Sequence, residues 1–158
     1  MSENTGTDTA VDPLSADVGD KELTKLPLLP GDRIMRFEIR KPTIAMAKKK
    51  GSENRVLTIP CHTVEDQVGV DGKTMNKGWP IFKRIVVTPG PKRDAQRIAG
   101  DVARLCQACG VRGVRVIDVI DNPVTHLEGK LFDGKTRIVP ESDGFPESND
   151  INPIPLAQ

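Results

Sequence analysis

The sequence predicts a mainly β domain, in which five strands form a Greek-key barrel and one helix lies between the third and fourth strands. Three observations lead to this fold class. Apolar and polar residues alternate along several short segments, as they do in half-buried strands. One segment instead shows helical spacing of its apolar residues. Thirteen prolines and fourteen glycines divide the 158 residues into short pieces, which disfavours a helix bundle.

The first two strands are predicted to form a long hairpin. In residues 33–46, Met35, Phe37 and Ile39 fall on one face and charged residues on the other. Pro42 cannot donate a ladder hydrogen bond, so it marks an edge, a bulge or a bend. Residues 55–64 alternate in the same way, and the basic stretch 48–52 supplies the turn between the two strands.

The remaining elements follow the same logic. Residues 79–88 predict a third strand, after a loop whose turns lie at Asp71-Gly72 and Lys77-Gly78. In residues 93–109 the apolar positions recur at helical spacing, with Asp94 and Gly110 where helix caps are expected. Residues 114–119 fit either a strand or an irregular packed segment. A fourth strand is centred on residues 135–139, and a short last strand is expected over residues 150–154.

Three strands, a helix and then one or two further strands suit the OB-fold, a five-stranded Greek-key barrel. An α+β sandwich and an SH3-like barrel are the alternative folds.

Charge divides the chain into three parts. Residues 1–30 carry six acids and two bases, and residues 141–158 carry four acids and no base. Residues 31–140 therefore hold 21 bases and 12 acids, a balance of +9. We interpret the chain as a flexible acidic N-terminal arm, a basic OB-like core and an acidic C-terminal extension with a last strand. A basic core between acidic ends is typical of a domain that binds a polyanion, although a small domain can also simply have charged faces.

Several classes of protein are disfavoured by what the sequence lacks. No run approaches 18 apolar residues, so we expect no transmembrane helix, and the N-terminus does not resemble a secretory signal. Three cysteines do not make a disulfide framework, so a cytoplasmic location is expected. Nucleotide-binding loops, a nucleophile elbow and paired carboxylates are all missing, so we expect no enzyme and no cofactor.

The cysteines offer one alternative. Cys106 and Cys109 form a single CxxC, which could join Cys61 with His62 or His126 in a zinc site. Both CxxC cysteines lie near the C-terminal end of the predicted helix, whereas a redox pair needs the N-terminal end to lower the thiol pKa. Cys109 also continues the apolar stripe, so buried packing is the better interpretation.

The candidate nucleic-acid-binding residues are basic side chains that track phosphates and aromatic rings that stack on bases. They comprise Arg36, Arg40, Lys48, Lys49, Lys50, Arg55, Trp79, Phe82, Lys83, Arg84, Lys135 and Arg137. Trp79 could equally be an anchor at the edge of the core, and Phe132 and Phe145 are undecided. With so few rings, electrostatics must carry most of the affinity, so we expect weak, salt-dependent binding unless self-association adds avidity.

Residues 127–156 resemble the C-terminal signature of a phage protein family encoded near replication and recombination genes. The signature is a Leu-x-Gly-Lys step, a charged alternating strand, a Gly-aromatic pair and an Asn-x-Ile close. Here those positions are Leu127, Gly129, Lys130, Lys135, Arg137, Gly144, Phe145, Asn149 and Ile151. Residues 26–39 are similar to the family's first strand. The resemblance, which spans roughly residues 27–154, implies an OB-fold protein that binds single-stranded DNA, in the host cytoplasm if the protein is phage-encoded.

Three hypotheses follow for the function. The first is a phage-type single-stranded DNA-binding protein of replication or recombination, which would also contact proteins of those processes and form homo-oligomers. The second is a protein–protein module or a structural phage protein, with the acidic ends as its contact surface. The third is an RNA or duplex binder. The first and third predict salt-dependent binding to nucleic acid, and the second predicts none.

Overall fold

The computed structural model describes residues 14, 27–47, 53–91, 93–142 and 144–156. These residues form a six-stranded antiparallel sheet and few helices, so the prediction of a mainly β fold is confirmed. In chain order the strands of the sheet are β1 (Ile34–Ile39), β2 (Thr43–Met46), β3 (Arg55–Thr63), β6 (Pro80–Val86), β7 (Leu131–Val139) and β8 (Ser148–Pro153).

The predicted first strand is divided in two at its proline. β1 and β2 both pair with β3. β2 pairs with the first half of β3, where Met46 lies opposite Arg55. β1 pairs with the second half of β3, where Ile39 lies opposite Cys61. Pro42 lies buried between them. Proline has no N–H to continue the ladder, so the chain bends there, and the expected hairpin with β3 is confirmed.

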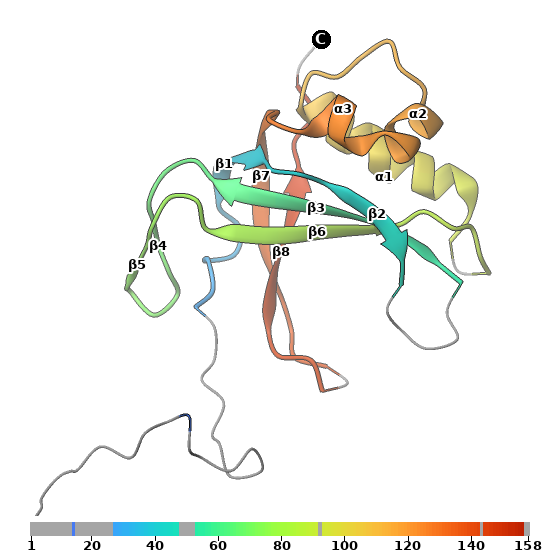
Figure 1. The fold of residues 1–158 in the computed structure, drawn as a ribbon. Helices are drawn as coiled ribbons and strands as arrows, with labels where there is room; N and C mark the ends of the chain where they lie inside the picture. Colours follow the sequence, from blue (N-terminus) through green and yellow to red (C-terminus); the bar gives the residue numbers. More distant parts are fainter. Residues whose placement is uncertain (1–13, 15–26, 48–52, 92, 143, 157–158) are drawn as a thin grey trace, which may run out of the picture.

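The other strands extend the sheet on both sides of β3. β6 pairs along the other edge of β3, whereas β7 returns beside β1 and β8 pairs with β7. β7 and β8 cross β3 and β6 steeply, and β8 comes into contact with β6 (Figure 1). Among the described residues no ladder joins β6 to β8, so the sheet is not a hydrogen-bonded closed barrel.

The long helix is confirmed as α1 (Ala95–Ala108). It begins after Asp94, whose Oδ1 accepts a hydrogen bond from the Arg97 N–H at 2.7 Å. Gly110 follows the helix with φ 74°, a left-handed conformation that glycine adopts without strain.

Two further helices lie between α1 and β7, where the sequence predicted none. They are α2 (Val116–Asp121) and α3 (Pro123–Leu127), so the prediction of a strand or irregular segment over residues 114–119 was wrong. Asp118 bonds both the backbone and the side chain of Arg115 at the start of α2, and Pro123 is at the start of α3. Such caps organise turns too short to show an apolar period.

The loop between β3 and β6 contains a small hairpin of β4 (Gln67–Val68) and β5 (Thr74–Met75). Both expected turns are present, because Gly72 and Gly78 have φ of 82° and 88°.

The core lies between the sheet and the helices. The predicted inward face of β1 is confirmed, since Met35, Phe37 and Ile39 are all buried. Phe37 stacks on Phe132 of β7 with ring centroids 5.6 Å apart, which places Phe132 in the core. Leu29 is also fully buried, although the charge pattern grouped it with the acidic arm. No helix in the described part of the chain has the length and apolar character needed to span a membrane.

Candidate nucleic-acid interface

The outer face of the β3–β6 ladder brings an exposed aromatic ring and a guanidinium together. Ile81 and Ile85 point into the core, so alternation turns Phe82 and Arg84 to the outside. Phe82 is 46% exposed, and Cζ of Arg84 lies 5.7 Å from its ring centroid. In the ladder Phe82 lies opposite Pro60 and Arg84 lies opposite Thr58, and these residues leave the Phe82 ring open to solvent. This is the only cation–ring pair among the described residues.

Arg40 borders the same face. Its backbone N–H donates to the Pro60 carbonyl at 2.9 Å, so it lies beside the strand position that faces Phe82. Its guanidinium Nε, however, donates to Glu38 at 2.9 Å. Both side chains are largely exposed, so this ion pair is weak and a phosphate could displace the carboxylate.

A second basic group lies at the end of the ladder where β2, β3 and β6 meet. Arg55 is exposed there, with its N–H bonded to Thr88 Oγ1 at 2.8 Å. Residues 48–50, the three lysines predicted to bind phosphate, lie outside the described residues. After Thr88 the chain turns, and Gly90 and Arg93 form a β-bridge. Arg93 is a further cation in this region, and the sequence reasoning missed it. The Pro-Gly-Pro turn after the third strand was the signal that could have found it.

Two of the other predicted cations of the sheet, Arg36 and Arg137, are paired with acids. Arg36 bonds Asp133 across the β1–β7 ladder at 2.9 Å, and Arg137 bonds Asp150 across β7–β8 at 3.0 Å. Hydrogen bonding and charge from Asp133 raise the pKa of Arg36 further. Lys135 is exposed on β7, and no acid pairs with it among the described residues. The Arg36–Asp133 pair is as exposed as the Arg40–Glu38 pair, so it is weak in the same way.

Lys83 has a different position from its neighbours on β6. It shares the inward side of the strand with Ile81 and Ile85, and its side chain is only 16% exposed. Its Nζ reaches Asp150 of β8 at 3.3 Å, and the same carboxylate also bonds Arg137. Lys83 therefore links the two strands that no ladder joins.

The ionisation of Asp150 should stabilise the fold. Burial by itself would raise the pKa of this carboxyl, but Lys83 and Arg137 outweigh it and the pKa is lowered. A pKa below the unfolded value of about 3.9 adds stability above that pH, which is lost as the pH falls through the folded pKa.

We expect Asp150→Asn to lower the free energy of unfolding at pH 7 by about 1–3 kcal/mol, because two cations lose their charged partner. The difference from the unsubstituted protein should shrink as the pH falls below about 4. Urea unfolding at several pH values measures both effects. Asp133→Asn, at an exposed pair, is the matched control and should cost less than about 1 kcal/mol. An Asp150→Asn effect of the same size at every pH would contradict the role of the charge.

The other aromatic candidates lie elsewhere. Trp79 is half-buried against the core, as expected of an anchor at the edge of the core, and its backbone N–H donates to Thr63 Oγ1 at 3.1 Å. Phe145 is 73% exposed in the turn between β7 and β8, where Glu141 and Glu147 are its charged neighbours. That turn is acidic, so Phe145 is poorly placed to meet a phosphate backbone.

The three thiols are buried or half-buried. Burial raises the pKa of Cys61 and of Cys109 to about 12 and also raises that of Cys106, so these thiols stay protonated at neutral pH. His62 points to the opposite side of β3 from Cys61, and its Nδ1 lies 2.9 Å from the Gly78 carbonyl oxygen. In the part of the chain that the structure describes, no three His, Cys, Asp or Glu side chains gather as a metal site.

The chain matches no protein-family model and no curated protein. The resemblance to a phage family therefore stays a prediction from the sequence.

Proposed function

We propose that this protein binds single-stranded DNA across the outer face of β3 and β6. The observation that carries the proposal is the exposed Phe82 ring with Arg84 beside it. A base can stack on an open ring whatever its identity, and a neighbouring guanidinium can bind the adjoining phosphate or stack on the base. Duplex DNA keeps its bases stacked inside, so this pair favours unpaired strands.

The connectivity supports the same proposal. β1 with β2, then β3 and β6, form three consecutive antiparallel strands. Helices follow, and β7 then returns beside β1. This is a Greek-key order with a helix after the third strand, as in the OB-fold, and we propose that the sheet is a variant of it. In OB-folds the second and third strands form the nucleic-acid face, and here these are β3 and β6.

The distribution of charges indicates the path that a bound DNA strand would take across the sheet. Arg84 and Arg55 belong to the β3–β6 ladder, and the lysines of residues 48–50 lie between β2 and β3 in the sequence. The β7–β8 turn is acidic and would repel phosphates. A strand would therefore run from Phe82 towards the β2–β3 hairpin. Coating of single strands in replication or recombination, as the family resemblance implies, is the role we propose.

The test is fluorescence anisotropy of a labelled oligo-dT and a matched duplex at several salt concentrations. We expect the single strand to bind more tightly and its affinity to fall steadily with salt. Replacing Lys48, Lys49 and Lys50 by serine should reduce the salt slope by up to about 2, at roughly 0.7 per phosphate contact. Equal affinity for both forms would indicate a duplex or general polyanion binder. Absence of binding at low salt would refute the proposal.

A protein-interaction module is the second candidate function. The observation that favours it is Phe145, 73% exposed at the tip of an acidic turn. A large exposed aromatic residue is typical of a contact surface for another protein. If no nucleic acid binds, Phe145 is the residue to substitute first in a pull-down experiment.

A further inference from the structure

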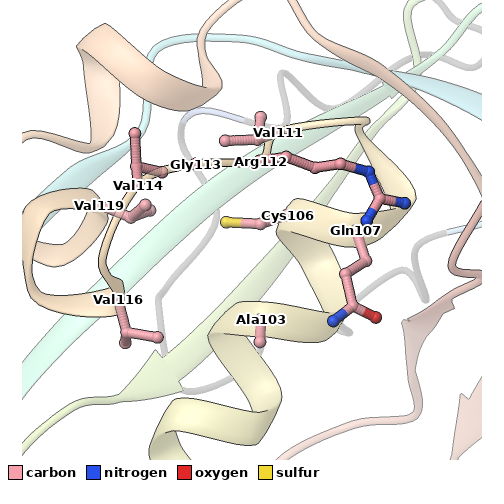
Figure 2. A pocket seen from close by; sticks show the side chains of 9 residues that line it. All are labelled: Ala103, Cys106, Gln107, Val111, Arg112, Gly113, Val114, Val116 and Val119. Carbon is pink, nitrogen blue, oxygen red and sulfur yellow. The ribbon is translucent and has the colours of Figure 1, made fainter.

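A pocket of about 240 Å³ opens between the second half of α1 and the segment that leads into α2 (Figure 2). Most of its lining is apolar and comes from Ala103, Cys106, Val111, Val114, Val116 and Val119. Figure 2 shows the Cys106 sulfur pointing towards Val114 and Val119. Pockets for cofactors and drug-sized ligands usually exceed about 300 Å³, so this one suits a single apolar side chain better.

The charge around the pocket is positive. Gln107 and Arg112 complete the lining, and none of the residues that line it is acidic. Arg112 is exposed and pairs with no acid in the part of the chain that the structure describes. Residues 102–119 carry three arginines and one acid, Asp118, which bonds Arg115 at 2.9 Å. An apolar side chain flanked by carboxylates therefore complements the pocket in both shape and charge.

The turn between β7 and β8 presents such a side chain. Phe145 is largely exposed there, and residues 140–149 carry three acids and no base. The Phe145 N–H donates to the Ser142 carbonyl at 2.8 Å, and the Ser142 N–H donates to the Phe145 carbonyl at 3.1 Å. These two hydrogen bonds fix the backbone at Phe145 before any contact forms, which lowers the entropy cost of binding.

The turn and the pocket lie at opposite ends of the molecule. The helices lie on one side of the sheet, and the turn between β7 and β8 extends away from them on the other (Figure 1). The Phe145 ring therefore does not reach the pocket of its own chain, whereas the pocket of a second copy is open to it.

We propose that Phe145 of one copy docks into the pocket beside α1 of a neighbouring copy, with Arg112 facing Glu141 and Glu147. The contact is head-to-tail, because turn and pocket are different surfaces, and it can therefore link copies in a row. It gives Phe145, the exposed ring of the second candidate function, a second copy as its partner. None of these residues belongs to the candidate nucleic-acid face, so the contact does not depend on DNA binding. A row of copies would, however, suit a protein that coats a strand.

Two variants that each disable one side of the contact provide the test. Phe145→Ala removes the ring and leaves the pocket intact, whereas Val114→Asp places a carboxylate at the pocket and leaves the turn intact. Val114 is 41% exposed, so its substitution should not unfold the chain. Methyl-labelled Phe145→Ala protein is titrated with unlabelled Val114→Asp protein in the absence of nucleic acid, and the valine methyl signals are followed by NMR.

We expect the methyl signals of Val111, Val116 and Val119 to shift and to give a dissociation constant of about 0.1–1 mM, since one side chain and exposed charges form the contact. A contact this weak leaves copies separate at the roughly micromolar concentrations of an anisotropy titration. The unlabelled double variant, Phe145→Ala with Val114→Asp, should cause no shift. No shift with about 2 mM titrant, or equal shifts with the double variant, would overturn the proposal.

A charge reversal at the pocket tests the electrostatic part of the contact. Adding Arg112→Glu to the labelled protein should weaken binding about fivefold or more, because a carboxylate would then face the acids of the turn. Arg97→Glu makes the same change elsewhere on α1 and, at about 0.1 M salt, should weaken binding less than about twofold. Equal weakening by the two changes would overturn the placement of Arg112 against the acids of the turn.

Discussion

Replacing Gly134 by alanine is expected to lower the free energy of unfolding by about 1–3 kcal/mol. Gly134 lies in the middle of β7, buried over the stacked rings of the core. A methyl group there would overlap Cγ2 of the fully buried Ile151, and it would lie 3.2 Å from the Phe132 ring and 3.4 Å from Phe37. Alanine is intrinsically better than glycine in a strand by up to about 1 kcal/mol, but the overlap outweighs that gain.

The same substitution at Gly100 is the matched control and should have the opposite sign. Gly100 is exposed in α1, and a methyl group there meets nothing within 4 Å. Alanine in a helix interior is favoured over glycine by about 0.8–1 kcal/mol, so Gly100→Ala should stabilise the protein. Thermal unfolding measures both, at roughly 2–4 °C per kcal/mol for a chain of this size. A stabilising Gly134→Ala would contradict the packing between β7 and β8.

Replacing Phe82 by alanine is expected to weaken binding of single-stranded oligo-dT by about 5- to 150-fold. This range follows from about 1–3 kcal/mol for one base stacked on an aromatic ring. Phe82 is half-exposed and not part of the core, so the variant should keep its stability. Because the ring carries no charge, the dependence of affinity on salt should not change. Arg84→Ala should instead reduce the salt slope by about 0.7, the contribution of one phosphate contact.

Phe145→Ala is the control for this experiment. It removes the same kind of side chain from another exposed position, at 73% exposure, but in the acidic turn between β7 and β8. Its affinity for oligo-dT should stay within about twofold of the unsubstituted protein. Equal losses for both variants would mean that the strand also crosses the β7–β8 turn. No loss for Phe82→Ala would remove the observation on which the proposed function rests.

The local periodicity of apolar residues was sufficient to predict the elements that are long and have one apolar face. β1, β3, β6 and α1 could be predicted because burial of one face forces a period of two or of 3.6 residues. The short helices α2 and α3 could not, since five or six residues are too few to show a period. Their caps and their packing on α1 and β2 stabilise them instead.

The candidate site, like the fold, could be predicted from the sequence only in part. Alternation along β6 predicts that Phe82 and Arg84 share a face, and the structure brings them together. The same alternation already placed Lys83 on the inward side with Ile81 and Ile85, a signal that the prediction of a phosphate contact overlooked.

The sequence by itself determined the mainly β class, the inward faces of the longer elements and the separation of a basic middle from acidic ends. The tertiary structure decided which charges pair with one another. Arg36 and Arg137 pair with acids 97 and 13 residues away, and these pairs form only once the register of β7 against its neighbours is set. The pocket beside α1 likewise depends on where α2 packs. Periodicity reports which face of an element is buried, but only the packing of distant elements brings particular side chains into contact.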